Sequence, residues 1–229
     1  MSKVIAIVGF GPGTATAVAE RFAAERFSIA LMARNEERLA AGVAALSARG
    51  ATVFGFPANA GDPESIRTAI RAVRSQMGPI AVLHWNVYGG LDAGDLLTAD
   101  VASVRTAFDA TVVGLLAATV EVLPDLKKSA SGAILVSNGA FGEVSAEVDE
   151  AAVNLHAMGL ALSSAAKNKL VGLLAQRLKG EGIYVGEVTV YGTIKGTPSG
   201  DGNSIDPVLI AEEYWRLYQT RSQTRAAVK

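Results

Sequence analysis

Short runs rich in β-branched residues alternate with longer alanine-rich segments along almost the whole chain. We expect a strand from each short run and a helix from each long segment: the strands are 3–8, 28–32, 51–56, 80–85, 132–137 and 183–190, with a candidate edge strand at 224–228, and the helices are 14–26, 35–48, 62–76, 100–127, 152–180 and 207–219. Repeated strand-helix units need crossovers, and right-handed crossovers place helices on both faces of a parallel sheet. The alternation therefore predicts an α/β fold with a doubly wound parallel sheet and three α/β/α layers.

No linker, repeat or low-complexity block divides the chain, so we expect residues 1–229 to form a single domain. Half of the 229 residues are hydrophobic, 50%, which is enough to bury a large core. The one long loop rich in glycine, serine and proline is 192–206, directly after the last long strand. Ligands of doubly wound folds bind at the carboxyl ends of the strands, so this loop is a candidate ligand loop.

Charge and cysteine content exclude several classes of function. The net charge is −1 without a run of basic residues, so we expect no nucleic-acid partner and no acidic membrane surface. The sequence has no cysteine, which excludes disulfides, thiolate catalysis and thiolate metal ligands, and we expect no metal site. We see no apolar run of the roughly 18 residues that a membrane helix needs, and the apolar N-terminal run is too short for a signal peptide. These features predict a soluble, cytoplasmic protein.

The turn after the first strand carries the first chemical signal. The stretch "VGFGPGTATA" places Gly9, Gly11 and Gly13 between a strand and a helix. Glycines there let backbone N–H groups approach a pyrophosphate at the positive end of the helix. Gly9 and Gly11 fit the first two glycines of G-x-G-x-x-G, whereas Thr14 stands at the third position. The turn predicts a dinucleotide site, and the alternative is a tight turn with a purely structural role.

The end of the second strand indicates which dinucleotide would bind. The sequence there is "LMARNEERL", with Arg34 where an acidic residue would accept hydrogen bonds from the ribose of NAD. A guanidinium suits the 2′-phosphate of NADP. Arg34 therefore favours NADP(H) over NAD(H), unless it is an ordinary solvated arginine at the start of a helix.

Lys167 is out of place in the stretch "LALSSAAKNKLVG". On a helix of about 100° per residue it shares an apolar stripe with Ser163 and several leucines. It either extends its ammonium from the edge of a packed face or meets a ligand there.

These motifs, in this order, resemble those of the short-chain dehydrogenase/reductase family over nearly the whole chain. "GFGPGTA" resembles the family's G-x-x-x-G-x-G turn, and "ARNEERL" resembles its NADP-type helix start. Three further stretches carry cofactor-binding positions: "PANAGD" with Asn59, "LHWNVYG" with Asn86, and "VYGTIKGT" with Gly192 and Ile194. The resemblance implies a Rossmann-like fold that binds NADP(H), with Asn59 beside the adenine and Lys167 on the nicotinamide ribose.

The resemblance also implies a divergent catalytic site. The family uses a tyrosine as acid/base, a lysine four residues later, a serine that holds the substrate oxygen and an asparagine in a proton relay. Lys167 matches the lysine, but Ser163, Asn138 and Thr111 stand at the other three positions. Asn138 can still donate a hydrogen bond to an oxygen, whereas a serine hydroxyl is a far weaker acid than a phenol.

Other side chains are candidates for the missing acid. His156 lies in the stretch between Asn138 and Lys167, and it reaches the site only if that stretch folds over the cleft; otherwise it is a surface or packing residue. Tyr88 and Tyr191 lie on segments that border the nicotinamide in the family, and packing is the alternative for each.

Three functions remain open. The first is an NADP(H)-dependent oxidoreductase acting on a small carbonyl or alcohol of unknown identity, with an atypical proton donor. The second is a catalytically silent NADP(H)-binding sensor or scaffold. The third is an interaction protein that binds no nucleotide. The resemblance further implies a homodimer or homotetramer formed through helices 100–127 and 152–180.

Overall fold

The strands form one parallel sheet at the centre of the molecule. The computed structural model describes residues 2–229. Within them the sheet has seven strands in the order β3-β2-β1-β4-β5-β6-β7, and every neighbouring pair is parallel. The strands are β1 Val4–Val8, β2 Ser28–Ala33, β3 Val53–Pro57, β4 Ile80–Trp85, β5 Ala133–Gly139, β6 Tyr184–Val190 and β7 Arg225–Val228. The predicted doubly wound parallel sheet is confirmed, and the strand order reverses between β1 and β4.

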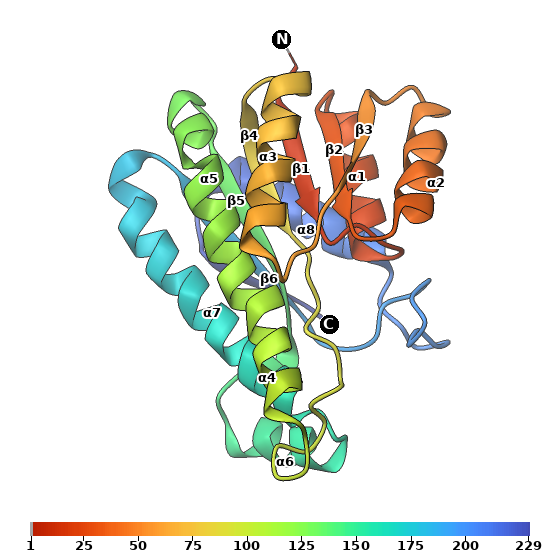
Figure 1. The fold of residues 1–229 in the computed structure, drawn as a ribbon, viewed down its shortest axis with the longest axis vertical. Helices are drawn as coiled ribbons and strands as arrows, with labels where there is room; N and C mark the ends of the chain where they lie inside the picture. The colour runs from red at the N-terminus through yellow and green to blue at the C-terminus, as the bar shows by residue number, and fades with distance from the viewer. Residues whose placement is uncertain (1) are drawn as a thin grey trace.

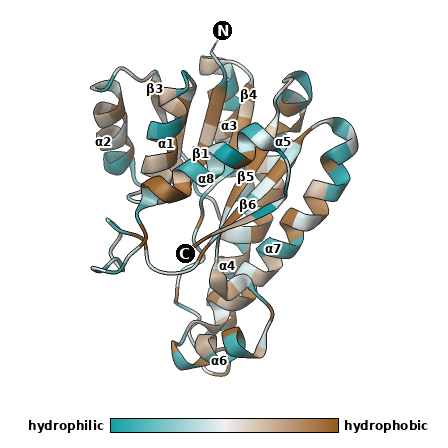
Figure 2. Ribbon diagram, turned by 180° about the vertical axis from the view of Figure 1, so that it is seen from behind, coloured by the Kyte–Doolittle hydropathy of each residue, from teal (hydrophilic) through white to brown (hydrophobic). Residues whose placement is uncertain are grey.

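Helices cover both faces of this sheet (Figure 1). They are α1 Thr14–Ala24, α2 Glu36–Ser47, α3 Pro63–Met77, α4 Val101–Phe108, α5 Gly114–Lys128, α6 Ala146–Asn154, α7 Met158–Leu178 and α8 Pro207–Thr220, with short 3-10 turns at Ala140–Gly142 and Lys179–Glu181. One core cluster lies between the sheet and α3, α5 and α7, and the other lies between the sheet and α1, α2 and α8. Figure 2 shows α1 and α8 on the face opposite to α3. The structure therefore has the three layers that the sequence predicts.

The central strands β1 and β4 are covered by helices on both faces. All five residues of β1 and all six of β4 are buried, as expected for apolar runs in a parallel sheet. Side chains of Asn35, Asp62, Asp100 and Asp206 cap the first turns of α2, α3, α4 and α8. These caps explain why the helix starts lie within a residue of the predicted ones.

The prediction of a single helix over 152–180 is wrong. The chain forms α6 and α7, and His156 lies in the break between them with φ 49°. The N–H of Met158 donates to the Gly94 carbonyl at 3.0 Å, and the N–H of Gly159 donates to the Ala93 carbonyl at 2.9 Å. Since the 93–94 loop satisfies these donors, α7 begins at Met158 instead of continuing α6.

The long helix expected over 100–127 is continuous but not uniform. A π-helical turn, Asp109–Val113, joins α4 to α5. Taken as one stretch, Val101–Lys128 is the one helix in residues 2–229 that is long and apolar enough to cross a membrane, and 44% of its most apolar window is buried. Because the core helix of a protein outside the membrane meets the same criterion, this finding alone does not indicate a membrane span.

Candidate functional site

The turn between β1 and α1 lies where the sheet reverses its strand order. Gly9 has φ 83°, and a Cβ built on it would lie 2.8 Å from the backbone oxygen of Asn86. The N–H groups of Gly9 and Phe10 both donate to the Met32 carbonyl at 3.0 Å. A side chain at Gly9 has no room, so the glycine lets the turn pack between the ends of β2 and β4.

The long loop after β6 closes over the second half of this turn. Gly13 also has φ 83°, and a Cβ on it would lie 2.8 Å from Cγ2 of Thr197 and 3.1 Å from Cγ2 of Ile194. Thr197 is held there because its hydroxyl donates to the Ile194 carbonyl at 2.7 Å. Gly192, with φ 146°, starts the loop. Sequence reasoning left Thr197 out of the site, although it follows Ile194 in the same motif.

Thr14 presents an unused hydroxyl at the start of α1. Its side chain is only 4% exposed, and its Oγ1 has no hydrogen-bond partner. The N-cap, Gly13, supplies no side-chain acceptor for the first N–H groups of the helix. A buried hydroxyl and free helix donors at one point match the oxygens of a bound anion.

Two arginines follow β2 near this turn. Arg34 and Arg38 are exposed, and within residues 2–229 neither side chain forms an ion pair. Nη1 of Arg38 lies 3.7 Å from the position of a Cβ built on Gly11. Sequence reasoning named Arg34 alone, yet Arg38 follows it by one helical turn. Both guanidinium groups are therefore available to a phosphate beside the glycine turn.

The two predicted cofactor-binding asparagines are engaged within the protein. Oδ1 of Asn59 accepts a hydrogen bond from the N–H of Gly61 at 3.1 Å, so the predicted acceptor faces its own loop. Asn86 donates from Nδ2 to the Gly9 carbonyl at 3.3 Å and accepts from Ser137 Oγ at 2.7 Å. Asn86 thus braces the glycine turn.

The hydrogen bonds of Asn86 continue through Ser137 to a buried aromatic pair, Tyr214 on α8 and His84 on β4. The Tyr214 hydroxyl donates to Ser137 Oγ at 2.8 Å, and the Tyr214 ring packs edge-on against His84. His84 is fully buried and its Nδ1 has no partner. Burial lowers the pKa of His84 to about 3, so the ring is neutral at ordinary pH.

His84 should make the stability of the protein depend on pH. Unfolding restores an ordinary pKa near 6.5, so the unfolded chain binds a proton that the folded chain refuses between pH 6.5 and 3. As the pH decreases from 6.5 to 3, we expect this residue alone to lower the free energy of unfolding by about 1.4 kcal/mol per pH unit. Urea unfolding of His84→Phe, which keeps the aromatic contact, should show a correspondingly smaller slope. Equal slopes would contradict the assignment.

All four positions of the catalytic set are buried. The exposed fractions are 0% for Ser163, 1% for Thr111, 4% for Lys167 and 6% for Asn138. A Cβ built on Gly89 would lie 3.1 Å from Ser163 Oγ and 3.3 Å from Thr111 Cγ2. The structure therefore brings Ser163, Thr111 and the backbone at Gly89 together. The 87–89 segment fills the space that a side chain larger than serine would need at position 163.

Lys167 turns toward the same segment. Its Nζ donates to the Val87 carbonyl at 3.3 Å. Burial lowers the pKa of Lys167 to about 8, and the negative charge of Glu187 partly opposes this. Lys167 is therefore neither a surface lysine nor one that extends to solvent.

The predicted role of Asn138 is wrong. Its Nδ2 donates to the Ser164 carbonyl at 3.0 Å and to Glu187 Oε1 at 3.3 Å, which uses both N–H groups. Because side chains alternate along β5, Asn138 points under α7. The next position, Gly139, would open into free space, since a Cβ there meets nothing within 4 Å. The residue at the open face of β5 is thus a glycine, which has no side chain to hold an oxygen.

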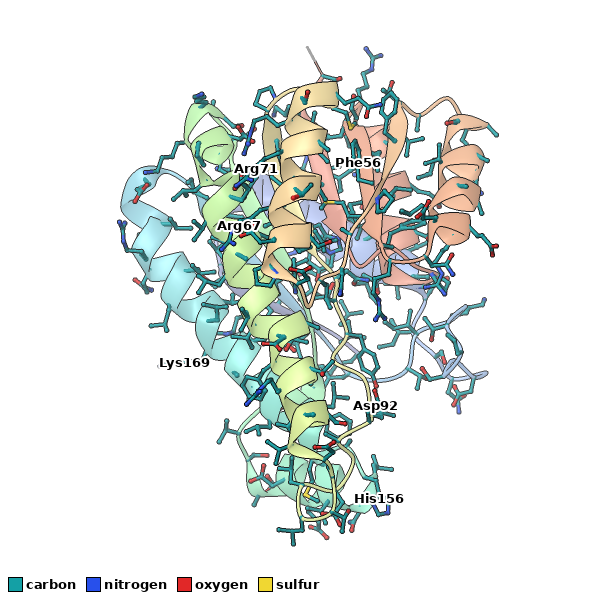
Figure 3. The ribbon with its side chains drawn as sticks, viewed as in Figure 1. Phe56, Arg67, Arg71, Asp92, His156 and Lys169 are labelled. Atoms are coloured by element: carbon teal, nitrogen blue, oxygen red, sulfur yellow. The ribbon has the colours of Figure 1, made fainter. Side chains whose placement is uncertain are left out.

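The other candidate acids are badly placed. His156 is exposed in the break before α7, at the lower end of the molecule in Figure 3, and its side chain points outward, so it is a surface residue in this structure. Tyr88 is 62% exposed, and its pKa is raised by partial burial and then by the charge of Asp92. The Tyr191 hydroxyl donates to Glu143, which raises the pKa of Tyr191. Both phenols are therefore weaker acids than a free tyrosine.

Comparison with known proteins agrees with this geometry. A family model described as short chain dehydrogenase matches residues 3–199. Sulfoacetaldehyde reductase 2 of Chromohalobacter salexigens is 30% identical over 139 residues, which are 61% of this chain and 55% of that protein. Estradiol 17-beta-dehydrogenase 11 of Macaca fascicularis is 24% identical over 143 residues, 62% of this chain and 47% of that protein. The chain spans about half the length of these curated relatives.

Solved structures share the fold over the full length. L-Sorbose reductase from Gluconobacter frateurii, complexed with NADPH and L-sorbose, has a TM-score of 0.86 at 20% identity and covers 100% of this chain and 95% of that one. An alcohol dehydrogenase from the archaeon Thermococcus sibiricus, complexed with 5-hydroxy-NADP, has a TM-score of 0.84 at 19% identity, with 100% and 96% covered. At these identities the likeness shows a common fold.

Proposed function

The chain belongs to the short-chain dehydrogenase/reductase family of oxidoreductases, and from that premise we propose that it binds NADP(H) and interconverts a small carbonyl compound and its alcohol. The observation that carries the proposal is the turn between β1 and α1. There the buried, unpartnered hydroxyl of Thr14 and the open N-terminus of α1 lie beside Gly13. Such a combination suits a pyrophosphate.

The residues present fit the rest of NADP(H) as well. Arg34 and Arg38 would hold the 2′-phosphate, and Thr197 would close over the pyrophosphate beside Gly13. Lys167 would hold the nicotinamide ribose. When bound, the cofactor supplies or accepts a hydride, and the chain must supply the proton.

Lys167 is the proton donor in this proposal. It is the only ionisable side chain at the four catalytic positions, since the others are Ser163, Thr111 and Asn138. Its pKa of about 8 lies closer to neutrality than that of a serine hydroxyl, as general acid catalysis requires. In the reducing direction the ammonium gives its proton to the carbonyl oxygen and is later reprotonated from solvent.

A purified, NADPH-loaded protein tests this function directly. We expect slow oxidation of NADPH, followed by its absorbance, with at least one member of a panel of small aldehydes and ketones. Lys167→Met should abolish that turnover, whereas Lys169→Met, which removes an ammonium that points away from the molecule (Figure 3), should leave it unchanged. Binding of NADPH without turnover of any panel member would overturn the enzymatic proposal.

A second candidate function is a catalytically silent NADP(H)-binding sensor or scaffold. It is favoured by one observation: Ser163 and Thr111 are buried under the backbone at Gly89. It predicts NADPH binding without turnover, which the same assay distinguishes.

Ser163→Tyr should not restore a normal catalytic site. Because Ser163 is fully buried against Gly89, a phenol there would overpack the 87–89 segment. We expect the free energy of unfolding to fall by about 1–3 kcal/mol, with no gain in NADPH turnover. Urea unfolding and the NADPH assay measure the two effects, with Lys169→Tyr on the exposed side of α7 as the control. A stable Ser163→Tyr variant with raised turnover would show that the space is open.

We also propose that the chain self-associates as a homodimer or homotetramer. The support is a set of exposed apolar side chains on α5 and α7: Leu116, Val120, Leu162 and Leu173. Exposed apolar residues gathered on two long helices fit a symmetric interface. Light scattering should give a mass of two or four chains, and a monomer mass would contradict it.

A further inference from the structure

Three charged side chains are buried in the part of the chain that the structure describes: Asp125, Lys167 and Glu187. Asp125 has a partner, because Nε of Arg74 lies 2.8 Å from its Oδ2. Lys167 and Glu187 form no such close ion pair in residues 2–229, yet they carry opposite charges on two adjoining elements, α7 and β6. A buried charge is costly unless another charge or several hydrogen bonds compensate it.

Glu187 is held by polar side chains of β5 and α7, one of which is the neighbour of Lys167 in the chain. Its Oε1 accepts hydrogen bonds from Asn168 Nδ2 at 3.0 Å and from Asn138 Nδ2 at 3.3 Å. Asn168 is the residue after Lys167, and Asn138 also holds the Ser164 carbonyl of the preceding turn. Hydrogen bonds through these two asparagines therefore link the carboxylate to α7 both before and after Lys167.

The second carboxylate oxygen of Glu187 has no partner. Oε2 is inaccessible to solvent and accepts no hydrogen bond. Glu187 is fully buried, so solvent does not compensate this oxygen, whereas a positive charge nearby would. The side chains that contact the other carboxylate oxygen, Asn138, Asn168 and Thr189, are all neutral.

Lys167 feels the negative charge of Glu187 across the contact between α7 and β6. That charge favours the protonated ammonium. Arg225 of β7 is a second charged group in this region, because it lies opposite Glu187 in the β6–β7 register and its Nη2 donates to the carbonyl and to Oδ1 of Asn168. The other groups are neutral: Ser163 on α7, Thr111 before α5, the Val87 carbonyl after β4, His84 on β4 and Tyr214 on α8. Tyr214 also feels the charge of Glu187, and its pKa is raised mainly by burial.

We propose that Glu187 is a positioning residue of the site: it is the buried counter-charge that keeps Lys167 protonated and holds its helical turn against the sheet. The consequence of this pair for NADP(H) rests on the proposed function, whereas the pair itself does not.

A direct titration of Lys167 in the cofactor-free protein tests the pair. With lysine labelled at Cε with carbon-13, NMR should show one lysine that titrates well below the surface lysines and disappears in Lys167→Arg. We expect Glu187→Gln, which keeps the shape and most hydrogen bonds, to lower that midpoint by about one pH unit or more. Asn168→Ala removes a hydrogen bond but no charge, so its shift should be clearly smaller.

A folded Glu187→Gln variant with an unchanged Lys167 midpoint would overturn the proposal. If Glu187→Gln does not fold, Glu187→Asp withdraws the carboxylate by one methylene and should also lower the midpoint; no change there would be equally decisive. A purely structural Glu187 would destabilise the fold on substitution without moving the lysine titration.

NADPH binding then separates this proposal from the proposed function. If Lys167 holds the cofactor, Glu187→Gln should lose about tenfold in NADPH affinity near pH 8 and little near pH 6, where the lysine recovers its proton. A shifted lysine midpoint without NADPH binding at either pH would keep the pair and reject the function.

Discussion

Gly13→Val is expected to weaken NADPH binding by at least about 100-fold, a loss of about 2.7 kcal/mol in binding free energy. Gly13 has φ 83°, a conformation that a β-branched residue adopts only under strain. Its Cβ would also lie 2.8 Å from Cγ2 of Thr197, so the loop after β6 must move away from the turn. Both effects displace the groups that we assign to the pyrophosphate.

Gly50→Val is the matched control for this substitution. Gly50 has the same φ of 83°, but a Cβ there meets nothing within 4 Å, at the exposed turn before β3. Both variants should lose similar stability from backbone strain, and only Gly13→Val should lose NADPH affinity by calorimetry. An equal loss in the two variants, or none in Gly13→Val, would remove the turn from the site.

Replacing Arg34 and Arg38 together by leucine is expected to reverse the cofactor preference. Each guanidinium would give a 2′-phosphate charge-assisted hydrogen bonds, and losing both should cost about 3 kcal/mol, or roughly 100-fold in NADPH affinity. NADH has no 2′-phosphate, so its affinity should stay within about threefold. The measurement is a titration of each variant with both cofactors.

Arg67→Leu serves as the control for the arginine pair. Arg67 lies on α3 and pairs with Glu64, and α3 packs on the face of the sheet opposite to α1 and α2, so its loss removes one positive charge on the other side of the sheet. It should leave the preference for NADPH unchanged. If the double variant loses NADPH and NADH affinity equally, the arginines do not read the phosphate.

The fold was predictable because it depends on patterns that repeat along the chain. Apolar runs such as 80–85 must be covered on both faces, and the helices between them follow from spacing and caps such as Asp62 and Asp206. The break before Met158 was not predictable in this way. It depends on carbonyls of Ala93 and Gly94, which are distant in sequence and offer no local signal.

The geometry of the β1–α1 turn was predictable because a glycine motif fixes the backbone there, as at Gly9 and Gly13. The side-chain contacts of the site were not predictable, because they depend on which face of a strand each residue points to. Asn138 and Gly139 are neighbours, and a shift of one residue in a strand exchanges the buried face for the open one. The role of Glu187 could not be predicted from the sequence, because its hydrogen bond from Asn168 forms only when α7 packs on β6.

Calorimetric titration of the purified chain with NADPH and then with NADH tests the central claim most directly. We expect saturable binding of NADPH in the micromolar range, about −8 kcal/mol, and binding of NADH at least about tenfold weaker. Absence of binding by either cofactor up to about millimolar concentration would contradict the assignment of the β1–α1 turn and identify the chain as a family member that has lost its nucleotide.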